Sequence, residues 1–379
     1  MKKSICIVLG ILLLCINVKC YGMPSVSAEA AILMEKNTSR VIYEKNADKR
    51  LPMASTTKII TAITVLEKEG IDMDSLIEIS ENAANTEGSS MYLEKGEKLT
   101  VRELLYGLML SSGNDAAVAL SEGVAESREE FIKLMNEKAW MIGAKNTHLT
   151  NPNGLPDENH YSTARDMAKI TSYALSDKTF SEIVKTKTFK IEGEGKAYPR
   201  TLTNHNKLLS MYEGCTGVKT GFTKAAGRCL VSSAERENMK LICVTLNAPD
   251  DWNDHINLYN FGYDKYKYKK IVSCEVPVCT ATVNGCKEDV NLYAGGDVHY
   301  PLKDNEGYGV ETSVYPGLST PLKNGEQVGK LIVEVNGRRA EIPLVVHGDV
   351  EAETVTKKFS EKLAESVKAF FSIWAGMMM

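Results

Sequence analysis

The sequence predicts an α+β fold in which an antiparallel sheet is flanked by helices. Apolar residues at 30–34, followed by Glu35, and at 41–43, on either side of a polar turn, predict a β-hairpin near the N-terminus. Apolar residues then recur every three or four positions, and β-rich runs return at 187–192, 215–220, 228–234 and 239–247. Strands, many helices and further strands indicate one domain, 29–268, whose sheet joins both of its ends.

Four segments in the middle of this domain have the periodicity of helices with one buried face. Three of them are apolar stripes, and the fourth begins at Thr163, which has an acidic residue, Asp166, three positions later, as at a capped helix start. The three stripes are Ile59–Leu66, Leu104–Met109 and Phe131–Met141.

Residues 269–350 read as a small β-sandwich domain. Its apolar runs are short, and Asn336-Gly337 is a strong signal for a hairpin turn. The strands that we expect are 276–278, 290–293, 312–314, 329–335 and 342–346.

Both ends of the chain have the composition of targeting segments. A basic start, an apolar run and the small residues Val26-Ser27-Ala28 predict a signal peptide over 1–28, with a retained N-terminal anchor as the alternative. Residues 351–379 predict an amphipathic helix, because apolar residues at steps of three or four alternate with lysine and glutamate. Its aromatic end favours a helix that lies in a membrane interface, although docking on the protein's own surface fits the pattern too.

The charge and the cysteines limit the partners. The formal charge is −4, and three lysines are the only charged residues among the first 28, so the rest of the chain carries −7. This acidic body argues against nucleic acid as a partner. Scattered histidines and the lack of zinc-type spacing predict no metal site. Cys215 and Cys229 flank a possible hairpin and either form a disulfide or pack as free thiols.

Ser55-Thr56-Thr57-Lys58 places a serine and a lysine one helical turn apart, just ahead of the first stripe. A serine hydroxyl needs a neighbouring base to act as a nucleophile. Lys58 can serve as that base if burial or a second cation lowers its pKa. The backbone N–H of Ser55, at the start of a helix, can also bind an oxyanion.

Ser112-Gly113-Asn114 interrupts two helical patterns and therefore predicts a loop that can aim side chains into a cleft. Ser112 can relay a proton to a leaving amine, and the amide of Asn114 can hold a substrate carbonyl. When this triplet is taken alone, a simple turn between helices explains it better.

Lys219-Thr220-Gly221 lies at the end of a β-rich run. Lys219 and Thr220 can bind a substrate carboxylate, while Gly221 permits a close approach of the backbone. The N–H of Phe222 can then complete an oxyanion hole with that of Ser55. Alone this triplet is also compatible with a strand that ends in a turn.

Together, the three motifs resemble those of the low-molecular-mass penicillin-binding proteins that act as serine-type D-alanyl-D-alanine carboxypeptidases. The resemblance covers almost the whole chain and implies a β-lactamase/transpeptidase-like domain followed by a stalk domain and a membrane anchor. Besides the three motifs, it rests on Asn153-Gly154-Leu155, on 160–166 and on 218–223.

The resemblance implies that Ser55 attacks the bond between the two terminal D-alanines of the peptidoglycan stem peptide. Lys58 is then the general base, Ser112 the proton relay and Lys219 the group that binds the terminal carboxylate. It implies no cofactor, inhibition by β-lactams that acylate Ser55, and a location at the outer face of the bacterial cytoplasmic membrane through the C-terminal helix.

The sequence departs from some members of this family at three places. Phe222 stands where some have histidine, and His205 stands where some relatives have arginine. An arginine that some members place about 35 residues beyond the third motif is also absent, since Asp254 or its neighbours stand there. These differences concern recognition of the substrate rather than the type of reaction.

Two other functions compete with this interpretation. A class A-like β-lactamase has similar motif spacing, but it needs a glutamate that activates the deacylating water, and 150–155 contains none. A cell-wall-binding module would keep the fold without turnover, which the intact Ser55, Lys58, Ser112 and Lys219 argue against.

Overall fold

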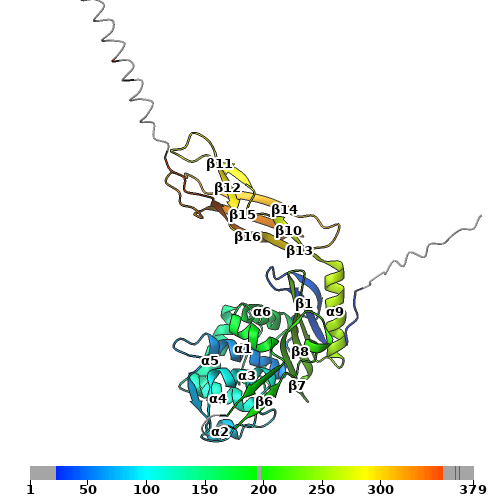
Figure 1. The fold of residues 1–379 in the computed structure, drawn as a ribbon. Helices are drawn as coiled ribbons and strands as arrows, with labels where there is room; N and C mark the ends of the chain where they lie inside the picture. The colour runs from blue at the N-terminus through cyan, green and yellow to red at the C-terminus, as the bar shows by residue number, and fades with distance from the viewer. Residues whose placement is uncertain (1–22, 194–197, 353–362, 364–366, 368–379) are drawn as a thin grey trace, which may run out of the picture. The chain divides into compact units, whose positions relative to one another are not determined.

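The computed structural model describes residues 23–193, 198–352, 363 and 367, and contacts divide the chain into two compact units near residue 264 (Figure 1). Most of the predicted signal peptide, 1–28, and most of the predicted helix, 351–379, lie outside the described residues. Within the described part, no helix is both long enough and apolar enough to cross a bilayer.

The first unit contains a five-stranded sheet in the order β2-β1-β9-β8-β7. The pairs β1–β2, β1–β9 and β7–β8 are antiparallel, and β1 lies between its hairpin partner and a strand from the far end of the domain. The predicted sheet that joins both ends is therefore confirmed. Its strands are β1 (Ala30–Glu35), β2 (Val41–Lys45), β7 (Cys215–Thr223), β8 (Gly227–Arg236) and β9 (Met239–Leu246).

The four predicted helices are present, and Thr163 caps the last of them by accepting a hydrogen bond from the Asp166 N–H. They are α1 (Lys58–Leu66), α3 (Val101–Leu110), α5 (Arg128–Met141) and α6 (Ala164–Ala174). The second helical pattern next to Ser112 is α4 (Asn114–Val124). The remaining elements are η1 (Ala54–Thr57), α2 (Glu81–Ala84), α7 (Lys178–Lys185), α8 (Leu208–Met211), α9 (Asp251–Lys265), β3 (Leu76–Glu78), β4 (Lys98–Thr100), β5 (Thr188–Ile191) and β6 (Arg200–Thr203).

The two faces of the sheet are covered by different helices (Figure 1). Ile32, Ile242 and Val244 belong to the main core, which they share with α1, α3, α4, α5 and α6. Because side chains alternate along a strand, the neighbouring residues face the other way, toward α9. A Cβ added to Gly262 of α9 would lie 2.8 Å from Leu241 Cδ1, so this helix packs closely against the sheet.

The second unit consists of strands. A five-stranded sheet has the order β11-β12-β16-β15-β14, and a second pair joins β10 to β13. Asn336-Gly337 makes the predicted hairpin turn with φ values of 51° and 73°. The strands are β10 (Lys267–Val272), β11 (Cys279–Ala281), β12 (Val290–Ala294), β13 (Val298–Leu302), β14 (Gly309–Val314), β15 (Gln327–Val335) and β16 (Arg338–Val346).

Two expectations about local structure are answered by the strand registers. The strand predicted at 276–278 is wrong: the strand begins at Cys279, and Pro277 has no N–H to give to a ladder. Cys229 lies opposite Gly221, and Cys215 lies opposite Ala234. Six strand positions, roughly 20 Å, separate the two cysteines along the hairpin, so they are free thiols.

Candidate active site

Two glycines, Gly154 and Gly221, let their chain segments pack closely against the backbone of Ala54 and Ser55. Ser55 lies in η1, and Ala54 before it has a φ of 50°. A Cβ added to Gly154 would lie 2.0 Å from the Ala54 carbonyl oxygen, and one added to Gly221 would lie 3.0 Å from the Ser55 nitrogen. The contact at Gly154, which also has a φ of 84°, excludes a side chain, whereas a side chain at Gly221 would require Ser55 to move by a few tenths of an ångström.

Lys58 is fully buried and its amine contacts three oxygens. Its Nζ lies 3.0 Å from Ser55 Oγ, 2.7 Å from Asn114 Oδ1 and 2.7 Å from the Asn153 carbonyl oxygen. Burial, followed by the charge of Lys219, holds the pKa of Lys58 well below its usual value. A neutral amine at this distance can accept the hydroxyl proton of Ser55.

Asn114, and not Ser112, is the residue of the second motif that touches Lys58. Its Nδ2 donates to the Glu87 carbonyl (2.7 Å) and its backbone N–H to the Ser89 carbonyl (2.7 Å), which fixes the amide. Ser112 is nearly buried, with a φ of 60°, in the predicted loop between α3 and α4. Among the described residues, no hydrogen bond joins its hydroxyl to either lysine.

Lys219 lies on β7, at the edge of the sheet, and is buried like Lys58. Its Nζ donates to the Thr220 carbonyl (2.9 Å), and burial lowers its pKa to about 7. Its charge acts on Lys58, and Gly221 packs against Ser55. The structure therefore brings all three motifs together, while the side chain of Phe222 stays two-thirds exposed.

His205 lies close to the same group of residues. Its backbone N–H donates to the carbonyl of Leu110, at the end of α3 (3.2 Å), and its pKa is lowered by burial and then by the charge of Lys219. Burial and the charge of Lys219 thus disfavour a positive charge on His205.

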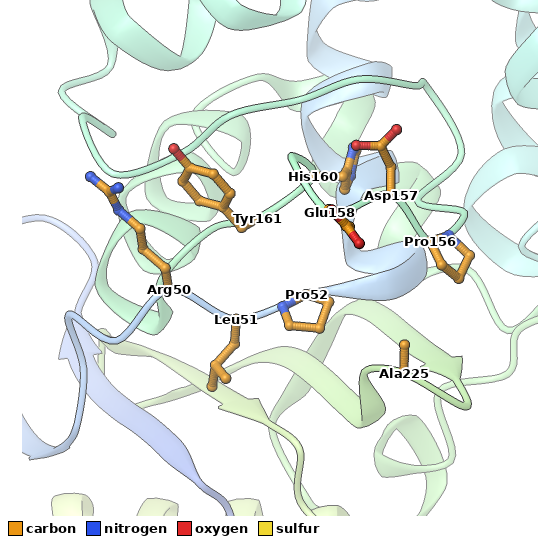
Figure 2. A pocket seen from close by; sticks show the side chains of 9 residues that line it. All are labelled: Arg50, Leu51, Pro52, Pro156, Asp157, Glu158, His160, Tyr161 and Ala225. Carbon is orange, nitrogen blue, oxygen red and sulfur yellow. The ribbon is translucent and has the colours of Figure 1, made fainter.

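His160 is linked through Thr57 to the backbone next to Ser55, and the sequence predicts no role for it. Its Nδ1 accepts the Thr150 backbone N–H (3.0 Å), so Nε2 carries the proton and donates to Thr57 Oγ1 (2.8 Å). Thr57 in turn donates to the carbonyl of Ala54 (2.8 Å). Burial lowers the pKa of His160 to about 4, so the ring is neutral at pH 7; Figure 2 shows it next to Asp157.

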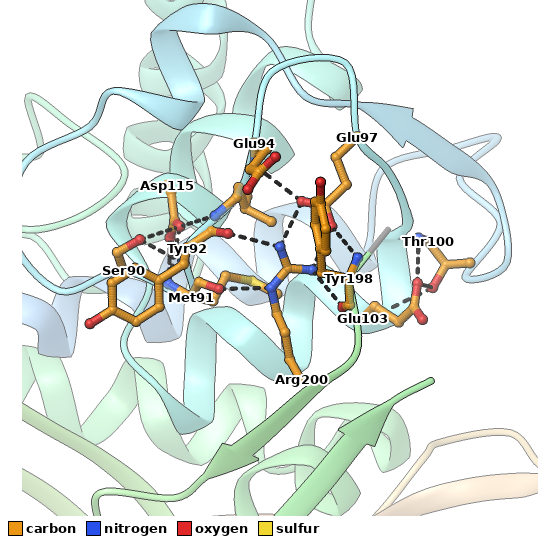
Figure 3. A network of polar contacts seen from close by, with 11 residues as sticks. Ser90, Met91, Tyr92, Glu94, Glu97, Thr100, Glu103, Asp115, Tyr198 and Arg200 are labelled. Carbon is orange, nitrogen blue, oxygen red and sulfur yellow. Dashed lines mark hydrogen bonds and ion pairs between the residues drawn. The ribbon is translucent and has the colours of Figure 1, made fainter. Parts of the chain in front are cut away.

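Asp115 and Arg200 fix the segment 90–93 from two sides (Figure 3). Asp115 is buried and accepts hydrogen bonds from two backbone N–H groups and the serine hydroxyl of this segment. Arg200 donates to two of its carbonyls and to both carboxylate oxygens of Glu97, at 2.6 and 2.8 Å. Because Asp115 directly follows Asn114, this network holds the wall of the site next to Lys58.

The described residues contain no group of three or more His, Cys, Asp or Glu side chains arranged to hold a metal ion. The polar groups around Ser55 are amines, amides and hydroxyls, which suit acyl transfer by a serine nucleophile with a lysine base.

Comparison with known families agrees with this chemistry. The model of the Peptidase_S11 family, D-alanyl-D-alanine carboxypeptidase, matches residues 17–250. The model of the penicillin-binding protein 5 C-terminal domain matches residues 266–352. The chain therefore belongs to the Peptidase_S11 family of D-alanyl-D-alanine carboxypeptidases.

Individual relatives cover both units. The chain is 34% identical over 336 residues to the D-alanyl-D-alanine carboxypeptidase DacF of Bacillus subtilis, which covers 86% of each chain. It is 35% identical to DacC of Escherichia coli, which covers 86% of this chain and 85% of the relative. Penicillin-binding protein 5 of Haemophilus influenzae superposes with a TM-score of 0.72 and 30% identity, over 87% of this chain and 99% of that one.

We expect Gly221→Ala to slow acylation by a fluorescent penicillin about tenfold, because its Cβ would lie 3.0 Å from the Ser55 nitrogen and shift it from its present position. The measurement is the second-order rate of labelling, with circular dichroism to check folding. Gly296→Ala is the matched control, since an added Cβ there meets nothing within 4 Å. A Gly221→Ala rate within a few-fold of the wild-type rate would contradict this role of the close approach.

Proposed function

We propose that this protein is a serine-type D-Ala-D-Ala carboxypeptidase that removes the terminal D-alanine from peptidoglycan stem peptides and is inhibited covalently by β-lactams. The observation that carries the proposal is the buried Lys58 amine, 3.0 Å from Ser55 Oγ, in a chain of the D-alanyl-D-alanine carboxypeptidase family.

In this mechanism Ser55 Oγ attacks the carbonyl carbon between the two D-alanines and its proton passes to Lys58. The carbon–nitrogen bond then breaks, and the departing amine of D-alanine takes up a proton by way of Ser112. Water attacks the resulting ester, releases the shortened peptide and restores the hydroxyl of Ser55. The contacts of Lys58 with Asn114 and Asn153 support its role as base, because they fix the amine beside the hydroxyl.

We assign recognition of the substrate to the third motif and to Asn114. Lys219 and Thr220 bind the terminal carboxylate, Asn114 contacts a substrate carbonyl, and the N–H groups of Ser55 and Phe222 bind the oxyanion. The packing of Gly221 on Ser55 supports this arrangement, because it places β7 directly beside the nucleophile.

A class A-like β-lactamase is less well supported. The segment that reaches Lys58 through the Asn153 carbonyl, 150–155, carries threonine, asparagine, proline, glycine and leucine but no carboxylate. Rapid hydrolysis of the penicilloyl-enzyme would need such a base next to the ester.

Mass spectrometry of the protein treated with benzylpenicillin will locate the adduct on the peptide that contains Ser55. Ser55→Ala will carry no adduct, and Lys58→Met will acylate about 100-fold more slowly or worse, because the hydroxyl loses its base. Wild type will also release D-alanine from diacetyl-L-Lys-D-Ala-D-Ala.

Ser210→Ala, at an exposed serine on α8, is the control and will behave as wild type. An adduct on another residue, or labelling that survives in Ser55→Ala, refutes the assignment. Penicillin labelling without any release of D-alanine would favour a wall-binding module.

We further propose that the protein is exported and stays at the outer face of the bacterial cytoplasmic membrane through residues 351–379.

The contacts at the N-terminus of the described chain argue that Val26-Ser27-Ala28 stay in the mature protein. Buried Asp254 accepts hydrogen bonds from the Ser27 N–H and hydroxyl (both 2.8 Å) and from the Ala28 N–H (3.0 Å). Cleavage after Ala28 would remove these bonds, and cleavage after Val26 would remove the hydrogen bond from Lys45 Nζ to the Val26 carbonyl (3.0 Å), so we place the cleavage before Val26.

The intact mass of the protein recovered from a membrane fraction tests both points. We expect an N-terminus at or before Val26, and release from the membrane by detergent but not by high salt. A mature chain that begins at Glu29, or one that is recovered only in the soluble fraction, would contradict the corresponding point.

A further inference from the structure

Arg228 lies on the strand next to the third motif and has no role in the mechanism above. β7 and β8 are neighbours in the sheet (Figure 1), and their register places Arg228 directly opposite Phe222 and Leu230 opposite Thr220. Residues that lie opposite each other in an antiparallel pair have their side chains on the same face, and so do residues two positions apart. Arg228 therefore shares one face of this hairpin with Phe222 and Thr220.

This face is the one that α9 covers further along β8. The hydroxyl of Ser232, which is on the same face of β8, contacts two side chains of α9 (both 2.6 Å). Gly221 faces the other way, since a Cβ added there would lie 3.0 Å from the Ser55 nitrogen, and Lys219 shares its face. Because β7 is the edge strand, a peptide that lies along it can meet Lys219 on one side and Thr220 on the other.

The Arg228 guanidinium is fixed on one side and open on the other. Its Nε and Nη2 both donate to Asp251 Oδ1, at 3.0 and 2.7 Å, and its Cζ lies 5.6 Å from the centre of the Trp252 ring. Nη1 makes no hydrogen bond to another described residue, and 42% of the side chain is exposed. The N–H groups of Nη1 are thus available to a ligand.

Thr220 offers a second polar group on the same face. Its carbonyl accepts a hydrogen bond from Lys219 Nζ, but its hydroxyl makes none with the described part of the chain. Thr220 is the diagonal neighbour of Arg228 across the two strands, and such neighbours are roughly 7–8 Å apart, which a long side chain can span. A carboxylate bound at the Thr220 hydroxyl is therefore within reach of the guanidinium.

The lysine of the third motif is a weak anchor for a carboxylate at neutral pH. Burial lowers the pKa of Lys219 to about 7, so about half of the molecules carry the charge at that pH. A guanidinium stays charged over the whole range, and its planar N–H groups match the two oxygens of a carboxylate. Arg228 thus has the chemistry that Lys219 supplies only in part.

We propose that Arg228 is a further specificity-determining residue: its guanidinium, together with the Thr220 hydroxyl, binds the free carboxylate of the D-alanine that is released. The inference rests on the proposed carboxypeptidase function and adds a recognition residue outside the three motifs. Asp251 holds the guanidinium in place, and the ligands selected are peptides that end in a free carboxylate.

Two peptides that differ only at the C-terminus test the proposal. One is diacetyl-L-Lys-D-Ala-D-Ala, and the other ends in D-alaninamide. Release of D-alanine or D-alaninamide at pH 7 gives the ratio of the two kcat/KM values. We expect wild type to prefer the carboxylate and Arg228→Gln to lower the ratio about tenfold, as for a charge-assisted hydrogen bond at a partly exposed site. Lys224→Gln, at an exposed cation in the turn of the same hairpin, will keep the wild-type ratio.

Arg228→Gln leaves the buried carboxylate of Asp251 without its cation, so stability has to be separated from recognition. The double variant Arg228→Gln/Asp251→Asn removes both charges, and we expect the same tenfold fall in the ratio. A purely structural role of Arg228 would lower kcat/KM for both peptides alike and leave the ratio unchanged.

A wild-type ratio near one, a wild-type ratio in Arg228→Gln or in the double variant, or an equal fall in Lys224→Gln overturns the role of Arg228. In these cases continued release of D-alanine would leave the carboxypeptidase function standing. No release from either peptide by wild type, together with no adduct on Ser55, would overturn both proposals.

Discussion

The burial of the Lys58 amine is the constraint on which the rest of the site depends. A lysine in water is protonated at neutral pH and cannot accept a proton from serine. Removing it from water, beside the second buried lysine, Lys219, favours the neutral amine. The three oxygens around Nζ provide hydrogen-bond partners for the buried amine. Without such partners a buried amine would strongly destabilise the fold.

This environment requires segments that are far apart in the sequence to meet within a few ångströms. Gly154 and Gly221 permit that approach next to the Ser55 backbone: a side chain would clash with the Ala54 carbonyl at Gly154 and would press on the Ser55 nitrogen at Gly221. Behind them, His160 fixes the Ala54 carbonyl through Thr57, and Asp115 holds the wall next to Asn114. The groups around Ser55 are therefore held in place by hydrogen bonds between residues outside the site.

The sequence predicted those parts whose signal is local. The N-terminal hairpin, the helices with one apolar face and the three motifs each depend on short-range spacing. The helix α9 was missed because its buried face is partly polar: His255 lies between the hydroxyls of Ser232 and Thr245 and gives no apolar stripe. The carbonyl of Asn153 was missed because a backbone contact carries no signal in residue type.

The same distinction explains the other omissions. The pair of Arg200 with Glu97 joins residues about one hundred positions apart, and nothing in either local sequence marks a partner at that distance. His160 and Gly154 belong to segments on which the family resemblance rested, but only the structure shows which atoms they fix. Short-range spacing in the sequence thus predicts which residues form the candidate site. Packing between residues far apart in the chain determines the environment, and with it the pKa, of those residues.

The pH profile of acylation by benzylpenicillin tests the central claim most directly, because in the mechanism that we propose the reaction needs the neutral amine of Lys58. A pKa held well below 10.5 predicts a second-order rate that rises with pH only at the acid end and stops rising well before pH 10. A rate that increases tenfold per pH unit up to pH 10 would mean that Lys58 titrates as an ordinary lysine, and would contradict the account.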